Sequence, residues 1–118
     1  MDARSRKDLI VDLVEARFPL EPVRAGLATY PWDLDEPLVY LTAAHIASVL
    51  GRFRSGELSA TDVMTWAEAL ELRDDVGYPE PDHILQRAVF ILANPDVNGA
   101  LTVRSAEALL TEFARRTA

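Results

Sequence analysis

The chain has 118 residues, of which 49% are hydrophobic and 26% are charged, a balance typical of a folded globular domain. Its 12 Lys and Arg against 19 Asp and Glu give a net charge of −7, which argues against a general nucleic-acid binder, because such proteins neutralise phosphates with cations. The absence of cysteine excludes disulfides, thiolate zinc sites and cysteine nucleophiles. The length predicts one domain over residues 1–118.

The N-terminal segment predicts an amphipathic helix and not a secretion signal. One helix face is formed by Leu9, Ile10, Leu13, Val14 and Phe18. Asp12 interrupts the apolar run of this segment, and a secretion signal needs a longer run. The longest apolar run in the chain, residues 88–93, is far shorter than a membrane span. We therefore expect a cytoplasmic protein. Eleven of the twelve cations are arginine, which suggests a GC-rich bacterial coding sequence.

The next segment predicts a short helix and then a loop. Pro22 suits the first turn of a helix that runs to about Ala28. Two prolines mark residues 29–40 as a loop. Leu38–Leu41 is a candidate extended piece, but the sequence offers it no evident strand partner.

Helix boundaries are well marked in the middle of the chain. Thr42 predicts an N-cap, and Gly56 predicts the left-handed residue that follows the end of that helix. Ser59 and Asp62 predict a capping box for the following helix. That helix is expected to end between Arg73 and Val76, with its inner face formed by Val63, Trp66, Ala67 and Leu70.

Two further helices complete the expected fold. Asp82 predicts the cap of a helix through about Asn94 that is apolar nearly all round, which indicates a place in the middle of a bundle. Leu101–Thr102 repeats the pattern of Leu41–Thr42 and opens a last helix, with an inner face of Val103, Ala106, Leu110 and Phe113. The sequence therefore predicts an all-α, compact bundle of five or six helices.

An acidic block is the most informative feature for function. Residues 57–82 hold eight carboxylates and one cation, Arg73. If the helix continued through this block, 100° per residue would place Glu68, Glu71 and Asp75 in one sector. Repulsion between like charges at this spacing destabilises a helix. The pattern favours a docking face for a basic protein, formed by Met64, Glu68, Glu71, Leu72, Asp74 and Asp75. The alternative is an ordinary solvated face.

The same carboxylates suggest a second hypothesis, a small magnesium-dependent nucleotide hydrolase. Glu68-x-x-Glu71 followed by Asp74 and Asp75 resembles half of the signature of the all-α nucleoside triphosphate pyrophosphohydrolases, and Glu68, Glu71 and Asp75 would be the residues that act. Those enzymes need a second acidic pair on a facing helix, which the later helices do not offer. We therefore expect no catalytic residues, no metal and no cofactor.

A family resemblance accompanies this pattern. Its residues are Leu41-Thr42, Val49-Leu50, Gly56-Glu57-Leu58-Ser59-Ala60, Trp66 through Val76, and Leu92-Ala93-Asn94-Pro95. Over about residues 38–115 the chain resembles small helical bacterial proteins and, more loosely, the helical immunity proteins that neutralise bacteriocin and polymorphic-toxin nucleases. The resemblance implies a small acidic inhibitor that binds a basic toxin in fixed stoichiometry.

The first hypothesis is thus a non-enzymatic protein-binding module, of which an immunity-type inhibitor is one form. It has a basic protein partner and no nucleic-acid or membrane partner. A structural homo-oligomer is a third alternative.

Overall fold

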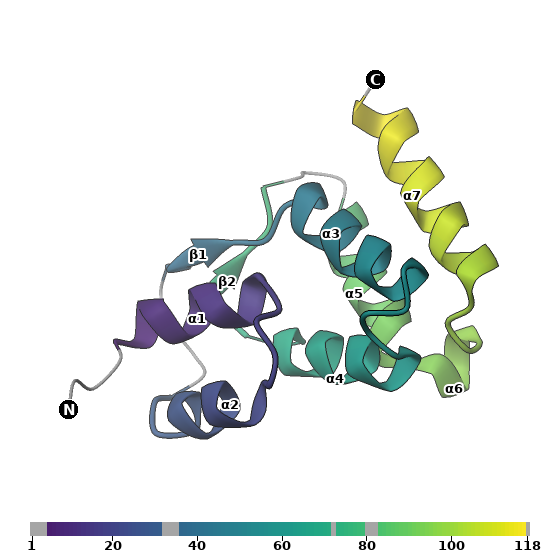
Figure 1. The fold of residues 1–118 in the computed structure, drawn as a ribbon. Helices are drawn as coiled ribbons and strands as arrows, with labels where there is room; N and C mark the ends of the chain where they lie inside the picture. The colour runs from purple at the N-terminus through teal and green to yellow at the C-terminus, as the bar shows by residue number, and fades with distance from the viewer. Residues whose placement is uncertain (1–4, 32–35, 72, 80–82, 118) are drawn as a thin grey trace.

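The computed structural model describes residues 5–31, 36–71, 73–79 and 83–117, with side chains described as far as Glu112. Within these ranges it contains α1 (Arg6–Val14), α2 (Glu21–Leu27), β1 (Val39–Tyr40), α3 (Ala43–Arg54), α4 (Ala60–Leu70), β2 (Val76–Gly77), α5 (Ile84–Ala93), α6 (Pro95–Asn98) and α7 (Val103–Thr117) (Figure 1). The all-α prediction is confirmed. The expected helices are present, and the four-residue α6 is an addition.

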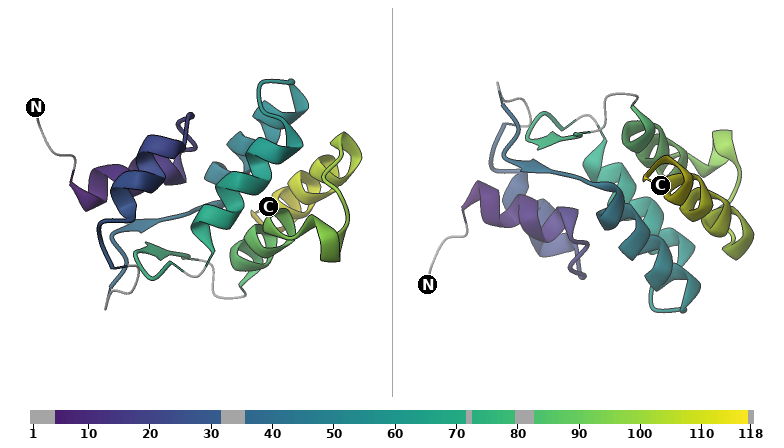
Figure 2. Two further views of the ribbon diagram at one scale, coloured as in Figure 1. Left: turned by 90° about the horizontal axis from the view of Figure 1, so that it is seen from below. Right: turned by 90° about the horizontal axis from the view of Figure 1, so that it is seen from above.

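The helices pack in pairs along the molecule. α1 lies against α2, α4 against α5, and α3 against α7. Figures 1 and 2 show α1 and α2 at one end and α7 at the other, with α3, α4 and α5 between them. α4 also contacts α1 and α3, so it joins the two ends of the fold.

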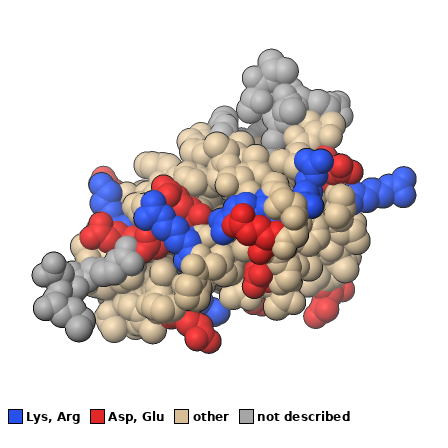
Figure 3. Space-filling view, viewed as in Figure 1, with Lys and Arg blue, Asp and Glu red and all other residues tan. Residues whose placement is uncertain are grey.

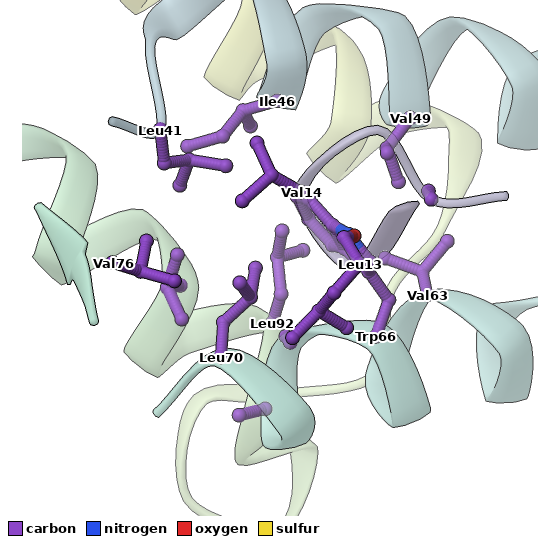
Figure 4. Close-up of a cluster of buried hydrophobic side chains, with 14 of the residues drawn as sticks. Leu13, Val14, Leu41, Ile46, Val49, Val63, Trp66, Leu70, Val76 and Leu92 are labelled. Atoms are coloured by element: carbon purple, nitrogen blue, oxygen red, sulfur yellow. The ribbon is translucent and has the colours of Figure 1, made fainter. Parts of the chain in front are cut away.

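Trp66 of α4 lies at the centre of the hydrophobic core, as predicted. Its side chain is 0% exposed, and its indole Nε1 donates a hydrogen bond of 2.7 Å to the carbonyl oxygen of Leu13. Because the single polar atom of the ring is satisfied, the whole ring is buried without an unpaired donor. Figure 4 shows aliphatic side chains of several helices around it, among them Leu13, Val49, Val63 and Leu70.

Side-chain capping sets the predicted helix boundaries. The backbone N–H of Ser59 donates to Asp62 Oδ2 (2.9 Å), and the N–H of Asp62 donates to Ser59 Oγ (3.0 Å), which confirms the capping box. Gly56 has a φ of +88°, so the glycine predicted after α3 does adopt the left-handed conformation. Thr42 is the N-cap of α3.

A short parallel strand pair corrects the expectation that Leu38–Leu41 lacks a partner. Val39 pairs with Val76 and Tyr40 pairs with Gly77. A Cβ at Gly77 would lie 2.7 Å from the Tyr40 ring and 2.8 Å from Pro37 Cγ, so only glycine allows this close approach. Strands of two residues show no periodicity in a sequence, which is why the pairing escaped prediction.

The C-terminal helices are less enclosed than predicted. Phe90 of α5 is 47% exposed, so this helix is not buried all round. Val103 is 50% exposed and does not belong to the inner face of α7, where Ala106 is buried and Leu110 is half-buried. The side chain of Phe113 and the predicted cap Asp82 lie outside the described residues.

Candidate functional site

The acidic block does not continue α4. The helix ends at Leu70, and its C-cap, Glu71, has a ψ of 138° and therefore an extended backbone. The predicted end between Arg73 and Val76 is therefore wrong by about one turn. Because the chain leaves the helix here, Asp74 and Asp75 do not lie on the helical face that carries Glu68.

Asp75 is the clearest departure from the predicted docking face. Its side chain is 0% exposed, whereas Asp74 beside it is exposed. Arg73 donates from Nε to Asp75 Oδ1 and from Nη2 to Asp75 Oδ2, both at 2.9 Å, and Arg6 Nε donates to Oδ2 at 3.1 Å. A buried carboxylate requires such pairing. Asp75 therefore cannot contact a partner, and its inclusion in the docking face is corrected.

The Asp75 cluster is a structural connection between distant segments. Arg6 belongs to the first turn of α1, and Asp75 directly precedes β2. The Arg6 guanidinium also lies 5.7 Å from the centroid of the Tyr30 ring and donates to the carbonyl oxygen of Pro31. The cluster thus fixes α1, the segment after α2 and the segment before β2 to one another.

The remaining predicted carboxylates do form an exposed group. Glu68 and Asp74 are exposed, and within the described ranges neither has an ion-pair partner. Glu71 is half-buried and accepts a hydrogen bond of 3.3 Å from Asn94 Nδ2. We call Glu68, Glu71 and Asp74 the acidic surface. Leu72 lies outside the described residues, so nothing is assigned to it.

Two hollows border the acidic surface. The first, of about 360 Å³, lies where α2 approaches α4 and is lined by Leu13, Arg24, Leu27, Ala28, Glu68, Ala69, Glu71 and Arg73. The second, of about 410 Å³, lies beside β2 and α5 and is lined by Glu71, Arg73, Asp74, Val76, Tyr78, Gln86 and Val89. Glu71 and Arg73 line both hollows, so each hollow holds at least one carboxylate and one guanidinium group.

Tyr78 contributes a neutral hydrogen-bonding group to the second hollow. Burial, together with the smaller effect of the negative charge of Glu71, raises the pKa of its hydroxyl to about 12. The phenol therefore keeps its proton at neutral pH. The hollow thus combines the carboxylates of Glu71 and Asp74 with a hydroxyl group.

Elsewhere on the molecule some acidic side chains are paired, while Asp8, Glu21 and Asp96 are exposed and have no ion-pair partner within the described ranges. Arg17 binds Glu15 (2.7 Å), Arg52 binds Glu57 (2.6 Å) and Arg54 binds Glu107 (3.2 Å). Figure 3 shows Lys and Arg beside Asp and Glu in several places on the face that it draws. The acidic surface differs from such pairs because Glu68 and Asp74 have no ion-pair partner among the described residues.

The magnesium hypothesis required Glu68, Glu71 and Asp75 to act together. Asp75 is instead bound by two guanidinium groups in the interior. Over the ranges that the structure describes, no three His, Asp or Glu side chains are placed to hold a metal ion.

An apolar groove is a feature that sequence reasoning missed. It measures about 410 Å³ and is lined by Ala60, Thr61, Met64, Ile91, Leu92, Pro95, Asn98, Gly99, Ala100, Leu101, Ser105, Ala108, Leu109 and Glu112. It therefore lies between α4, the end of α5, the α6–α7 connection and α7. Met64, predicted as part of the docking face, lines this groove. No local sequence pattern indicates it, because residues from several separate helices line it.

The structure thus defines a mostly helical protein with an acidic surface and an apolar groove. Comparison with family models, with curated proteins and with solved structures gave no match for this chain. In the described part of the chain, no helix combines the length and apolar character needed to cross a membrane.

Proposed function

We propose that this chain is a non-enzymatic protein-binding module whose acidic surface docks a basic protein. The observation that carries the proposal is the exposure of Glu68 and Asp74 without ion-pair partners within the described ranges, beside two hollows that share Glu71. Uncompensated charge costs stability through self-repulsion but accelerates the encounter with a partner of opposite charge. A net charge of −7 extends this attraction over the molecule.

The partner class that fits best is a basic nuclease toxin, for which the chain would act as an immunity-type inhibitor located in the cytoplasm of a bacterium. The support is the acidic balance together with the resemblance over residues 38–115 described above. Such an inhibitor needs no catalytic group, since it acts by covering the cationic surface with which a nuclease holds phosphates.

The experiment uses the chain as bait in lysate from its native organism, followed by kinetic measurements with the purified partner. The test variant reverses two charges, Glu68→Lys with Asp74→Lys, and the control Asp8→Lys makes a reversal at an exposed position of α1. We expect the double reversal to lower the association rate constant at least tenfold and to weaken its salt dependence. The control should change the rate constant less than twofold.

An association rate constant that is the same for wild type and the double reversal would overturn the proposal. For a nuclease partner, one equivalent of wild-type chain should abolish cleavage of nucleic acid, and the double reversal should require a large excess.

A further inference from the structure

One row of residues runs along α4 from the apolar groove to the acidic surface. Thr61 and Met64 line the groove, and Glu68 and Glu71 line the first hollow. The spacings of three and four residues place Thr61, Met64 and Glu68 on one face of α4, and Glu71 follows as the C-cap of the helix. All four are exposed or half-buried. With a rise of 1.5 Å per residue, the row extends over roughly 15 Å.

The groove end of this row is shaped for apolar side chains. The buried side chain of Leu92 lines the groove, and the half-buried side chains of Met64, Ile91 and Leu109 line it as well. Exposed Ala60 and Ala108 stand at its edge, where larger side chains would fill it. An apolar cleft of about 410 Å³ has the size of a site that buries an anchor side chain or two.

Charge selects the kind of occupant. Glu112 is the charged residue among the groove-lining positions in the described part of the chain, and the row ends at the acidic surface. No Lys or Arg lines the groove within that part, so an anionic segment in the groove would meet the carboxylate of Glu112, whereas the first hollow holds Arg24 and Arg73 beside Glu68 and Glu71. A second copy of the chain is disfavoured, because each copy carries a net charge of −7.

We infer that the groove and the acidic surface form one docking surface for a single amphipathic helix of the basic partner. The inference rests on the proposed function and adds the partner's form: apolar side chains enter the groove, and Lys or Arg side chains on the same face lie against Glu68, Glu71 and Asp74. A helix suits this surface because residues three and four apart point the same way, which matches the row on α4. About three turns of partner helix cover the row.

The test uses two synthetic amidated helical peptides of equal length. The first carries two leucines on one face of its first half and three lysines on the same face of its second half. The second peptide has alanine in place of both leucines. Affinity is measured by fluorescence anisotropy, and the binding position by amide shifts of the isotope-labelled full chain. We expect the leucine peptide to bind at least tenfold more tightly, with shifts at Met64 and Leu109 as well as Glu68.

Matched variants separate the two halves of the surface. Ala108→Phe and, independently, Thr61→Phe fill the groove from exposed positions, while Ala25→Phe makes the same change on α2 away from it. Filling the groove should remove the tenfold gain in affinity that the leucines give. The affinity of the alanine peptide should stay unchanged. The Ala25→Phe control should bind both peptides as the wild type does.

The outcomes distinguish this inference from the proposed function. If both peptides bind equally and shift only the acidic surface, the single-helix inference is overturned while the proposed function stands. If the charge reversal at Glu68 and Asp74 weakens neither peptide, the acidic surface is not a docking site and both proposals fail. Circular dichroism of each variant confirms that the helices are retained.

Discussion

The two terminal helices are attached to the molecule in different ways. α1 buries Leu9, Ile10, Leu13 and Val14 in the core, and Arg6 in its first turn binds the buried Asp75. α7, by contrast, has one fully buried residue among its described side chains, Ala106. Its neighbours Leu109 and Leu110 are half-buried, and an ion pair to α3 lies at the surface.

This difference means that one end of the molecule contributes most to stability, while the other leaves apolar surface accessible. The α1 end combines buried apolar area with a charge cluster that is strongly destabilising to break. The α7 end retains a groove, so apolar surface there stays accessible to another molecule. Segments that bind partners generally come from the less stable part of a fold. The comparison therefore agrees with placing the apolar half of the proposed docking surface beside α7, while its acidic half lies nearer to α1 and α2.

The largest expected effect is at the α1 end. Asp75→Ala leaves the guanidinium groups of Arg6 and Arg73 without their buried partner, and should lower the free energy of unfolding by about 3–5 kcal/mol. Urea denaturation followed by circular dichroism measures the change. Asp74→Ala, at the exposed neighbouring position, is the matched control and should change the free energy of unfolding by less than about 0.5 kcal/mol.

A loss of this size is a large fraction of the total stability of a small domain, about 5–15 kcal/mol. Asp75→Asn provides a second variant that keeps the side-chain shape and one acceptor oxygen. If both Asp75 variants were as stable as Asp74→Ala, the cluster would not be what holds α1 in place.

The sequence predicted the parts of this fold that depend on neighbouring residues. The Ser59–Asp62 box and the turn at Gly56 are local, so their chemistry is visible in the chain. Asp75 was placed wrongly because its ion pair with Arg6 joins residues 69 positions apart, and no local pattern reports such a contact. The prediction that Glu68, Glu71 and Asp75 share one face also assumed that α4 continues past Leu70. The helix instead ends there, and the chain continues to β2.

The candidate site was therefore predicted in part. Glu68 and Asp74 are exposed as expected, since charged side chains without partners stay in water. The groove at Met64 could not be predicted, because it depends on how α7 lies relative to α4 and α5.

The caps of α3 and α7 offer a second, smaller comparison. The N–H of Thr42 donates to His45 Nδ1 (3.0 Å), and the N–H of Thr102 donates to Ser105 Oγ (2.9 Å). Only the first acceptor titrates. Burial lowers the pKa of His45, with Glu15 acting in the opposite direction. A lowered pKa means that this contribution is present above the unfolded pKa of about 6.5 and is lost as the pH falls through the folded value.

We expect Ser105→Ala to cost about 1 kcal/mol of unfolding free energy, equally at pH 5 and pH 7. His45→Gln keeps an acceptor at the third helical position, so it should resemble the wild type at pH 7 and be less sensitive to acid. Urea denaturation at both pH values measures this. A wild type and a His45→Gln variant with the same acid sensitivity would contradict the assignment.

The smallest expected effect concerns the ion pair that joins α3 and α7. Arg54 Nη2 lies 3.2 Å from Glu107 Oε2, and the two side chains are 45% and 52% exposed. A double-mutant cycle with Arg54→Ala and Glu107→Ala should give a coupling energy of about 0.5 kcal/mol or less, because water screens an exposed pair. The coupling should also decrease in high salt.

This cycle tests whether α7 is weakly held. A coupling energy near that expected for Asp75 would mean that charge anchors α7 as firmly as α1, and the groove would then be a rigid feature of the fold. A small value leaves Ala106 and the half-buried leucines as the main attachment of α7. In that case α7 can adjust its distance from α4 at little cost, which allows the groove to accept apolar side chains of different sizes.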